Sequence, residues 1–340
     1  MFVGKWWGNR DLPPIVALHG WQDNANTFDN LVPLLHTKSF LAIDLPGHGL
    51  SSHLPPGQAY LFIEYVLALH RVILSLNHEK IPLLAHSLGS AVSYCYSAFF
   101  PDKVQYFVSI ECARSLLTIL NLNFTKALAT YIDKHLEIES LQDSAPSFKL
   151  SELVKSYSSG SIGSILPESA LIILKRSLAP SSSANYRKLP AGFKTNLNSF
   201  LEAESVDVSK GRLKYNQVTI DQLKKVMDSI EKFQLNEPDG YFTNTRDQRL
   251  KLNGFGAPNP EFIAAMAHSV TCPVLSVRAK GGFLFNMSSE LYEETLCRLK
   301  KSSSYFEHHE VDGSHHVHIN QSENVAPLVN NFLDKLAPIS

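Results

Sequence analysis

The sequence predicts an α/β fold, with a mostly parallel central sheet flanked by helices and a helical segment inserted near the middle of the chain. Two observations lead to this prediction. Short apolar runs alternate with helical stretches through the first third of the chain, an order typical of parallel strands joined by right-handed crossovers. This alternation stops after Arg114 and returns at about residue 269. A chain of 340 residues, 44% of them hydrophobic, is long enough for one large domain with an insertion.

The expected strands of the first part are apolar runs that each end at turn-forming residues. Buried strands of a parallel sheet have this pattern because both of their faces are covered. These strands are IVALHG (Ile15–Gly20), FLAIDLPGHG (Phe40–Gly49), IPLLAHS (81–87) and VQYFVSIE (104–111).

Helices are expected between these strands, where apolar residues recur at helical spacing. The first is TFDNLVPLL (27–35), with Thr27 or Asp29 available as a cap. The second is Leu61–Leu76, and the third is GSAVSYCYSAFFP (89–101), which ends at a proline.

The middle of the chain, residues 115–268, contains no further apolar strand of this kind. Helical spacing recurs there between Ser- and Pro-containing stretches. The expected helices are residues 116–137, 151–159, 168–178 and 219–233. We therefore expect a core domain of residues 1–114 and 269–340, with residues 115–268 forming a helical cap or lid on the strand ends.

The last part of the chain returns to the sheet. A strand is expected at CPVLSVRA (272–279), then a helix at SSELYEETLCRLK (288–300). A last strand, YFEHHEV (305–311), and a last helix, ENVAPLVNNFLDKL (323–336), complete the core.

Composition and charge exclude several classes of function. A formal net charge of −1 gives no electrostatic argument for binding nucleic acid or anionic membranes. No apolar run approaches the length of a membrane span, and the first residues lack the apolar stretch of a secretory signal. Four widely spaced cysteines, Cys95, Cys112, Cys272 and Cys297, favour free thiols in a reducing compartment. We expect an intracellular protein, cytoplasmic or peroxisomal, although the C-terminal APIS is not an SKL-type address.

Ser87 is the candidate nucleophile, because it lies between an apolar strand and a helix in the pattern Ala85-His86-Ser87-Leu88-Gly89. A nucleophile elbow, G-x-S-x-G, needs small neighbours around a serine on a sharp turn. Here alanine replaces the first glycine, which a position with negative φ tolerates. The backbone N–H of Leu88, at the start of the helix, is placed to stabilise an oxyanion.

A second oxyanion donor is expected from HGWQDN, which follows the first core strand. The backbone N–H of Trp21 can point into the site, and Gly20 lets the backbone approach. We expect His19 to be structural, and Asp23 and Asn24 to hold the loop by local hydrogen bonds.

The candidate base is one of the histidines in DGSHHVHINQ, after the last strand. A base must follow that strand on a loop that reaches back to the serine, and His315, His316 and His318 are all available. A metal site that also includes His308 and His309 is a competing hypothesis. No cysteine and no helical spacing of histidines typical of metal ligands supports it. Neither a metal nor a cofactor is expected.

Together these motifs resemble the α/β-hydrolase superfamily, and within it the serine hydrolase-like (Kraken-type) group. The resemblance runs almost the whole length of the chain and is loose across residues 115–241. The stretches that carry it are GKWWG, LHGWQDNANTFDNLVPLL, AIDLPGHGLSSH, AHSLGSAVSY, FFPDKV, TRDQRLK, CPVL and DGSHHVHINQSENVAPLVNNFL. It implies that the base stands two residues after a glycine, which favours His315 over His316.

The resemblance also raises the question of the acid. Many members of the superfamily have an aspartate just beyond the strand that reads PVLSV here, but this chain has Lys280, Gly281 and Gly282. A lysine cannot accept a hydrogen bond from an imidazole N–H. Some members, including haloalkane dehalogenases, have the acid on the strand between the serine's strand and that one, which points to Glu111. Asp312 is a second choice, and we expect it to hold a turn.

The resulting hypothesis is an acyl-enzyme serine hydrolase with Ser87, His315 and Glu111 as triad. The expected substrate is a small-molecule ester of a small or medium apolar acyl group, which makes the protein a carboxylesterase. A catalytically degenerate hydrolase that serves as a ligand-binding or signalling protein is the alternative, suggested by Ala85 and by the missing acid after PVLSVRA. Acyl transfer to an acceptor other than water is a third hypothesis. The sequence leaves the oligomeric state open.

Overall fold

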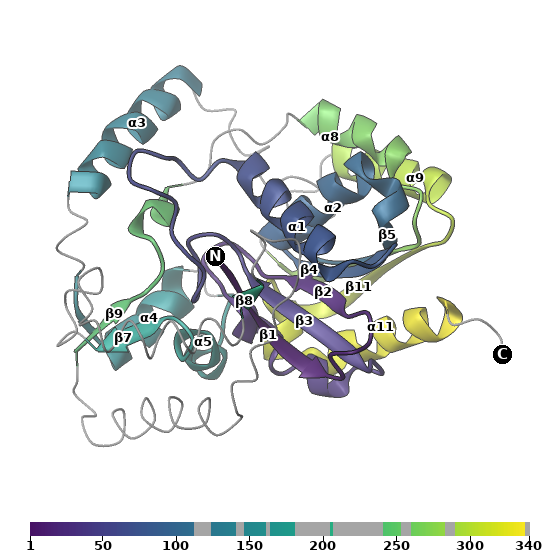
Figure 1. Cartoon of the computed structure of the whole chain (residues 1–340), viewed down its shortest axis with the longest axis horizontal. Helices are drawn as coiled ribbons and strands as arrows, with labels where there is room; N and C mark the ends of the chain where they lie inside the picture. Colours follow the sequence, from purple (N-terminus) through teal and green to yellow (C-terminus); the bar gives the residue numbers. More distant parts are fainter. Residues whose placement is uncertain are drawn as a thin grey trace.

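The computed structural model shows the architecture in which the functional residues lie. It describes residues 1–111, 124–140, 146–160, 164–180, 205–206, 241–252, 260–282 and 290–336. Within these ranges a long twisted sheet crosses the centre of the molecule, with helices on both of its faces (Figure 1).

The described part of the central sheet has the strand order β11-β10-β5-β4-β2-β3-β1-β8. All pairs from β11 to β3 are parallel, whereas β1 pairs antiparallel with both β3 and β8. The strands are β1 (Phe2–Gly8), β2 (Ile15–Leu18), β3 (Ser39–Asp44), β4 (Ile81–His86), β5 (Val104–Ile110), β8 (Ser205–Val206), β10 (Val274–Gly281) and β11 (Phe306–Ser314). The prediction of a mostly parallel sheet is confirmed.

Two apolar clusters pack on opposite faces of this sheet, because successive side chains of a strand point to opposite faces. Val16 and Leu18 belong to one cluster, and Ile15 and Ala17 of the same strand belong to the other. The first face is covered by α1 (Phe62–Leu76), α2 (Leu88–Phe99), α8 (Pro260–Met266) and α9 (Glu290–Ser302). The second is covered by α11 (Ser322–Leu336), which the short α10 (Val317–Asn320) precedes.

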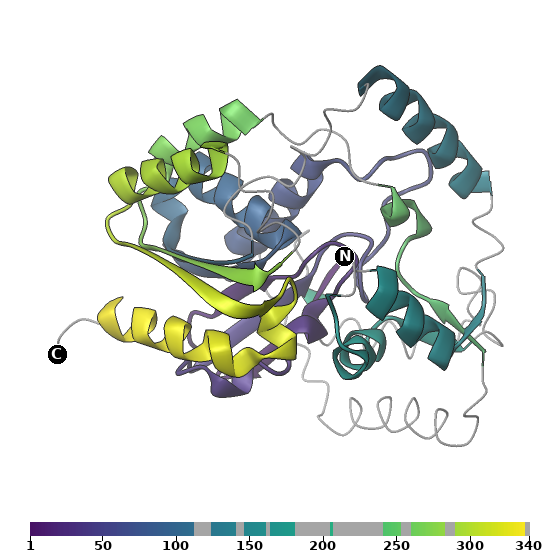
Figure 2. The same ribbon diagram turned by 180° about the vertical axis from the view of Figure 1, so that it is seen from behind.

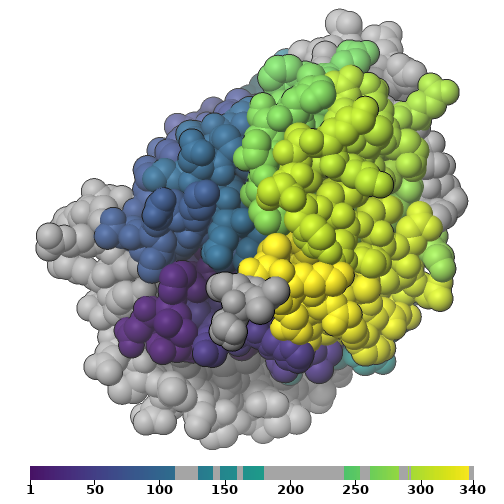
Figure 3. Space-filling model, turned by 90° about the vertical axis from the view of Figure 1, so that its right-hand side faces the viewer, coloured from purple at the N-terminus to yellow at the C-terminus, as the bar shows by residue number. Residues whose placement is uncertain are grey.

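Segments from the two ends of the chain lie together on the outside of the core. Seen from the side in Figure 3, α11 is close to the N-terminal segment, and α8 lies between α2 and α9. The core therefore joins segments from both ends of the chain. It also includes α8 and β8, which lie within the residues 115–268 that were expected to form the lid.

Three helices and a small sheet of the predicted insertion lie at the side of the molecule away from α9 and α11 (Figures 1 and 2). These helices are α3 (Phe124–Ser140), α4 (Leu150–Gly160) and α5 (Pro167–Leu174), whereas α8 of the same predicted range packs on the core beside α9. The small antiparallel sheet, which the sequence did not predict, is made of β6 (Phe148–Lys149), β7 (Leu178–Pro180) and β9 (Tyr241–Asn244). Strands of two to four residues are too short to show an alternating pattern.

Several expectations for individual elements need correction or remain untested. The stretch 27–35 is not an α-helix but two 3-10 turns, Ala25–Phe28 and Val32–Leu34, and the cap of the first is Asn24. Pro33, which cannot donate an N–H, stands in the second turn. The expected helix at residues 219–233 and residues 116–123 lie outside the described ranges. No helix among the described residues is both long and apolar enough to cross a membrane.

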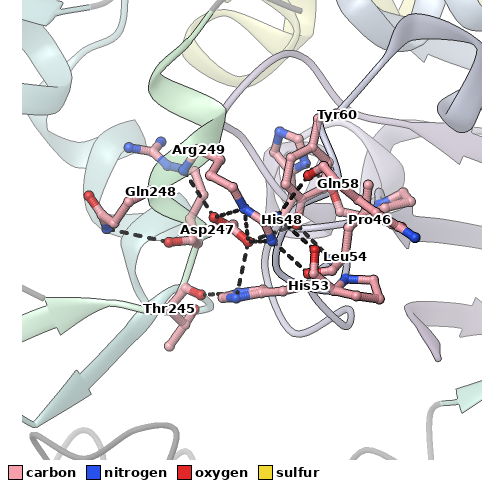
Figure 4. A network of polar contacts seen from close by, with 12 residues as sticks. Pro46, His48, His53, Leu54, Gln58, Tyr60, Thr245, Asp247, Gln248 and Arg249 are labelled. Atoms are coloured by element: carbon pink, nitrogen blue, oxygen red, sulfur yellow. Dashed lines mark hydrogen bonds and ion pairs between the residues drawn. The ribbon is translucent and has the colours of Figure 1, made fainter. Parts of the chain in front are cut away.

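A buried ion pair attaches the insertion to a core loop (Figure 4). The Asp247 carboxylate accepts from Arg249 Nη2 at 2.8 Å and from the Tyr60 hydroxyl at 2.9 Å. The guanidinium of Arg249 also donates to the carbonyls of Pro55 and Gln58, at 2.9 and 2.8 Å. Both members of the pair are 2% exposed, so each charge depends on the other.

Replacing Arg249 by Met is expected to lower the free energy of unfolding by about 3 kcal/mol, because it leaves the Asp247 charge buried without its main partner. Urea unfolding followed by circular dichroism measures the change. Arg298→Met is the matched control, since Arg298 pairs with Glu294 one helical turn away on the exposed face of α9. Such a pair contributes about 0.3–0.5 kcal/mol. Equal losses in the two variants would show that the buried pair does not stabilise the fold.

Candidate active site

Ser87 lies at the turn between β4 and α2, at the carboxyl end of a central strand. Its φ of 51° and ψ of −115° are unusual for a residue with a side chain, and such strain is typical of a nucleophile elbow. The Ser87 N–H donates to the Ile110 carbonyl at 3.0 Å, which ties the turn to β5. The serine is 4% exposed.

The residues around Ser87 explain why alanine fits at position 85 and glycine is required at position 89. Ala85 is a buried strand residue, paired with Leu18 and Ser109, so its φ does not require glycine. A Cβ on Gly89 would lie 2.3 Å from the Leu18 carbonyl oxygen. The Gly89 N–H donates to the His19 carbonyl at 3.1 Å, and α2 therefore begins directly against the loop after β2.

His315 connects the serine to a carboxylate. Its Nε2 is 2.9 Å from Ser87 Oγ, and its Nδ1 is 2.8 Å from Glu111 Oε2. His315 is 4% exposed and lies between the end of β11 and α10. A neutral ring that donates from Nδ1 to a carboxylate has its Nε2 lone pair free to accept the serine proton.

The other two candidate histidines have different partners. His316 Nδ1 is 2.8 Å from Ser164 Oγ, and His318 Nε2 is 2.8 Å from Thr27 Oγ1. His308 and His309 lie on β11 and contact Ser276 and Glu307, respectively. Of the three histidines left open by the sequence, His315 is the one that the fold places between Ser87 and a carboxylate.

Glu111 follows β5, which lies between β4 and β10 in the sheet. Its φ is 69°, and its side chain is buried. Oε1 accepts the Ala279 N–H while Oε2 contacts His315. A backbone conformation this strained in a residue other than glycine is a mark of functional sites.

The end of β10 has no acid, and Glu111 fills the space. A Cβ on Gly282 would lie 2.2 Å from Glu111 Oε2, so the carboxylate occupies the room that a side chain at this strand tip would need. Lys280 points away into solvent and pairs at 3.1 Å with Asp312, whose side chain is 87% exposed. Asp312 is therefore remote from the buried ring of His315.

Burial controls the electrostatics of this group. Burial lowers the pKa of His315 to about 3, and the nearby His316 ring adds to the effect. Burial also raises the pKa of Glu111 to about 8, against the opposing hydrogen bond from the Ala279 N–H. In both groups burial disfavours the charged form, so the resting state favours a neutral His315 ring whose Nε2 faces Ser87.

The expected oxyanion donors lie on the two loops that meet beside Ser87. Leu88 is the first residue of α2, so its N–H has no carbonyl partner within the helix. Trp21 follows Gly20, where a Cβ would lie 2.8 Å from His86 Nδ1. His19 is structural as expected, because its Nδ1 lies 2.7 Å from the Gly20 carbonyl and its Nε2 accepts the Leu45 N–H at 2.9 Å.

The sequence did not reveal a buried ion pair that supports these loops. Asp44, at the end of β3, accepts from Arg176 Nε at 2.9 Å and from the Ala25 and Leu50 N–H groups at 2.8 and 2.9 Å. A buried acid at a strand end requires a cationic partner, but the sequence does not say which of the many Arg and Lys residues it is.

Comparisons with known proteins identify the family. A family model described as "alpha/beta hydrolase fold" matches residues 13–136. A Drosophila melanogaster protein named "Probable serine hydrolase" is 30% identical over 332 residues, which cover 97% of this chain and 83% of that protein. A Danio rerio "Serine hydrolase-like protein" is 28% identical over 339 residues, covering 98% and 86% of the two chains.

Solved structures agree on the fold. A hypothetical protein from Pseudomonas aeruginosa superposes with a TM-score of 0.70 at 24% identity, covering 98% of this chain and 95% of that one. A thioesterase domain from the curacin biosynthetic pathway gives 0.67 at 17% identity, covering 97% and 95%. Because the sequence relationship to the fly and fish proteins extends through core and insertion alike, this chain belongs to the serine hydrolase-like family of α/β-hydrolases.

Proposed function

We propose that the protein is an active serine hydrolase that works through an acyl-enzyme, with Ser87 as nucleophile, His315 as base and Glu111 as acid. The observation that carries this proposal is the continuous chain of contacts from Ser87 Oγ through His315 to Glu111, at 2.9 and 2.8 Å. All three residues are 4% exposed, and buried groups keep such contacts free of competition from water.

The proposed reaction has two halves. Ser87 Oγ attacks the ester carbonyl and its proton passes to His315 Nε2. The N–H groups of Trp21 and Leu88 stabilise the negative oxygen of the tetrahedral intermediate. His315 then gives its proton to the departing alkoxide, which leaves as an alcohol. Water, deprotonated by His315, attacks the acyl-enzyme and releases the carboxylic acid, and the proton returns to Ser87.

The substrate class that we propose is an ester of a small or medium apolar acyl group. Two apolar residues of the insertion, Ile165 and Ile173, pack against Ile319. Ile319 lies four residues after His315 in the sequence. This packing supports the α4 and α5 part of the insertion as a lid with apolar side chains near the site. Apolar walls with few polar groups are typical of sites for such ligands.

A series of p-nitrophenyl esters with acyl chains of two to twelve carbons, the chain lengths being chosen for the assay, tests this function. We expect hydrolysis with a burst of p-nitrophenol equal to the enzyme concentration, since an acyl-enzyme accumulates, and a maximum at short or medium chains. Product analysis in the presence of an added alcohol tests transfer to another acceptor. Failure of the folded protein to hydrolyse any ester of the series would reject the carboxylesterase proposal.

Gly282→Ala is expected to lower kcat/KM for the preferred ester by about 10–100-fold, because its methyl group displaces the Glu111 carboxylate, and small misplacements of catalytic groups have effects of this size. Steady-state kinetics measures the change. Lys280→Ala is the matched control on the same strand end and should leave kcat/KM unchanged. A Gly282→Ala enzyme with full activity would show that the position of the carboxylate does not matter.

A further inference from the structure

Behind the proposed triad lies a second group of buried polar side chains, which the proposed reaction does not use. Asp23 Oδ2 is 3.7 Å from His86 Nδ1 and 3.4 Å from His316 Nε2. These three atoms all lie within 4.8 Å of one another. The residues are 3%, 0% and 6% exposed, and they come from the loop after β2, the end of β4 and the loop before α10.

Two of these atoms have no hydrogen-bond partner among the described residues. They are Asp23 Oδ2 and His86 Nδ1. His86 Nε2 lies 2.9 Å from the His315 carbonyl oxygen, which can only accept, so Nε2 carries the proton. In a neutral ring, Nδ1 then has a bare lone pair. This lone pair faces the Asp23 carboxylate, so two acceptors point at each other in a buried place.

A ring nitrogen lone pair that faces a carboxylate oxygen is the arrangement that a bound cation requires. Histidines that bind a metal usually donate their other ring nitrogen to a carbonyl, a carboxylate or another polar group, which fixes the tautomer. His86 makes such a contact with the His315 carbonyl, and His316 Nδ1 makes one with Ser164 Oγ. Bonds of about 2.0–2.2 Å to a tetrahedral zinc ion separate its ligand atoms by about 3.3–3.6 Å. The distances from Asp23 Oδ2 to the two rings, 3.4 and 3.7 Å, are close to this range, and the two ring nitrogens lie within 4.8 Å of each other, so a small shift of one ring completes the geometry.

We propose that Asp23, His86 and His316 form a binding site for a divalent transition-metal cation of the zinc class. Two imidazoles and one carboxylate suit zinc and its first-row neighbours better than magnesium or calcium, which prefer oxygen ligands. A fourth position is left for a water molecule or another small ligand. The site joins the loops that carry Trp21, Ser87 and His315, and it is separate from the acyl chemistry proposed for them.

Cobalt binding to the full chain tests the site without any substrate. The purified protein, freed of metal with a chelator, is dialysed for long enough to let the ion reach a buried site, against Co²⁺ and then against Zn²⁺. We expect one Co²⁺ per chain, a visible absorption band of tetrahedral cobalt, its loss when Zn²⁺ displaces cobalt, and a rise of Tm with Zn²⁺ since only the folded state holds the ion.

Variants assign the binding to these residues. Asp23→Asn and His316→Gln should each remove the absorption band, and Ser164→Ala should weaken cobalt binding by about 10–100-fold, as loss of a supporting hydrogen bond does. His309→Gln is the matched control, because His309 pairs with Glu307 on the surface of β11, and it should bind cobalt like the wild type. Circular dichroism shows whether each variant is folded.

Two results would overturn the proposal. One is a folded wild type that shows neither the cobalt absorption band nor a rise of Tm with Zn²⁺. This result would mean that a proton or a water molecule bridges Asp23 and the two rings. The other is equal binding in the wild type and in folded Asp23→Asn, which would assign the ion to histidines elsewhere. Both results are independent of whether the protein hydrolyses esters.

Discussion

Ser87→Ala is expected to reduce kcat/KM for the preferred ester by on the order of 10⁴–10⁶-fold, because no other group on this turn can form the acyl bond. The burst of p-nitrophenol should disappear with it. The free energy of unfolding should stay within about 1 kcal/mol of the wild type, since the substitution removes one small hydroxyl. Stopped-flow kinetics and urea unfolding measure the two effects.

A matched control for Ser87→Ala is Ser90→Ala, because Ser90 lies in the first turn of α2, the helix that Ser87 caps. The Ser90 hydroxyl donates to the Ala85 carbonyl and has no part in the proposed reaction, so this variant should keep the burst. If Ser87→Ala retained the burst while folded, the nucleophile would be another residue.

Glu111→Gln is expected to lower kcat by about 10³–10⁴-fold with little change in KM. An amide cannot stabilise the protonated ring of His315 and does not fix the tautomer that has a free lone pair on Nε2. The substitution keeps the size of the side chain, and the oxygen of the amide can still accept the Ala279 N–H. Steady-state kinetics separates kcat from KM.

Asp312→Asn is the control for Glu111→Gln. Asp312 is exposed and pairs with Lys280 at 3.1 Å, so its neutralisation should leave kcat unchanged. If Asp312→Asn were the damaging substitution and Glu111→Gln retained full turnover, the acid would have been placed on the wrong strand.

The core of the fold could be predicted from the sequence because its signals are local. The strands β2, β3, β4, β5 and β10 are apolar runs bounded by turns, and α2, α9 and α11 have amphipathic spacing, so pattern alone locates them. Strand β1 was not predicted as a strand, since GKWWG lacks a long apolar run. Its identity depends on antiparallel pairing with β3, which lies 30 or more residues further along the chain.

The residues of the candidate site differ in how far the sequence predicts them. Ser87 has a motif that contains its own structural context, and a resemblance selected His315 among three histidines. Glu111 could be inferred only because the usual position on β10 is empty. Its positive φ and the space left by Gly282 are properties of the folded chain. The pair of Asp44 with Arg176 joins residues 132 positions apart, and local sequence carries no sign of such a contact.

The contacts of Asp23 show the same limit. The sequence suggested local hydrogen bonds for this residue, yet its carboxylate lies between the rings of His86 and His316. His316 is 293 positions away from Asp23, and a sequence pattern cannot show that two such residues meet in a buried place.

Labelling with a fluorophosphonate tests the proposed chemistry most directly, because the reagent reacts with a serine only where a base and oxyanion donors activate it. Intact mass and peptide mapping of the wild type should show one adduct, on Ser87. The adduct should be absent in Ser87→Ala and in His315→Ala and should form much more slowly in Glu111→Gln. A folded wild type that is not labelled would contradict an active hydrolase and would favour a binding or signalling protein built on the same fold.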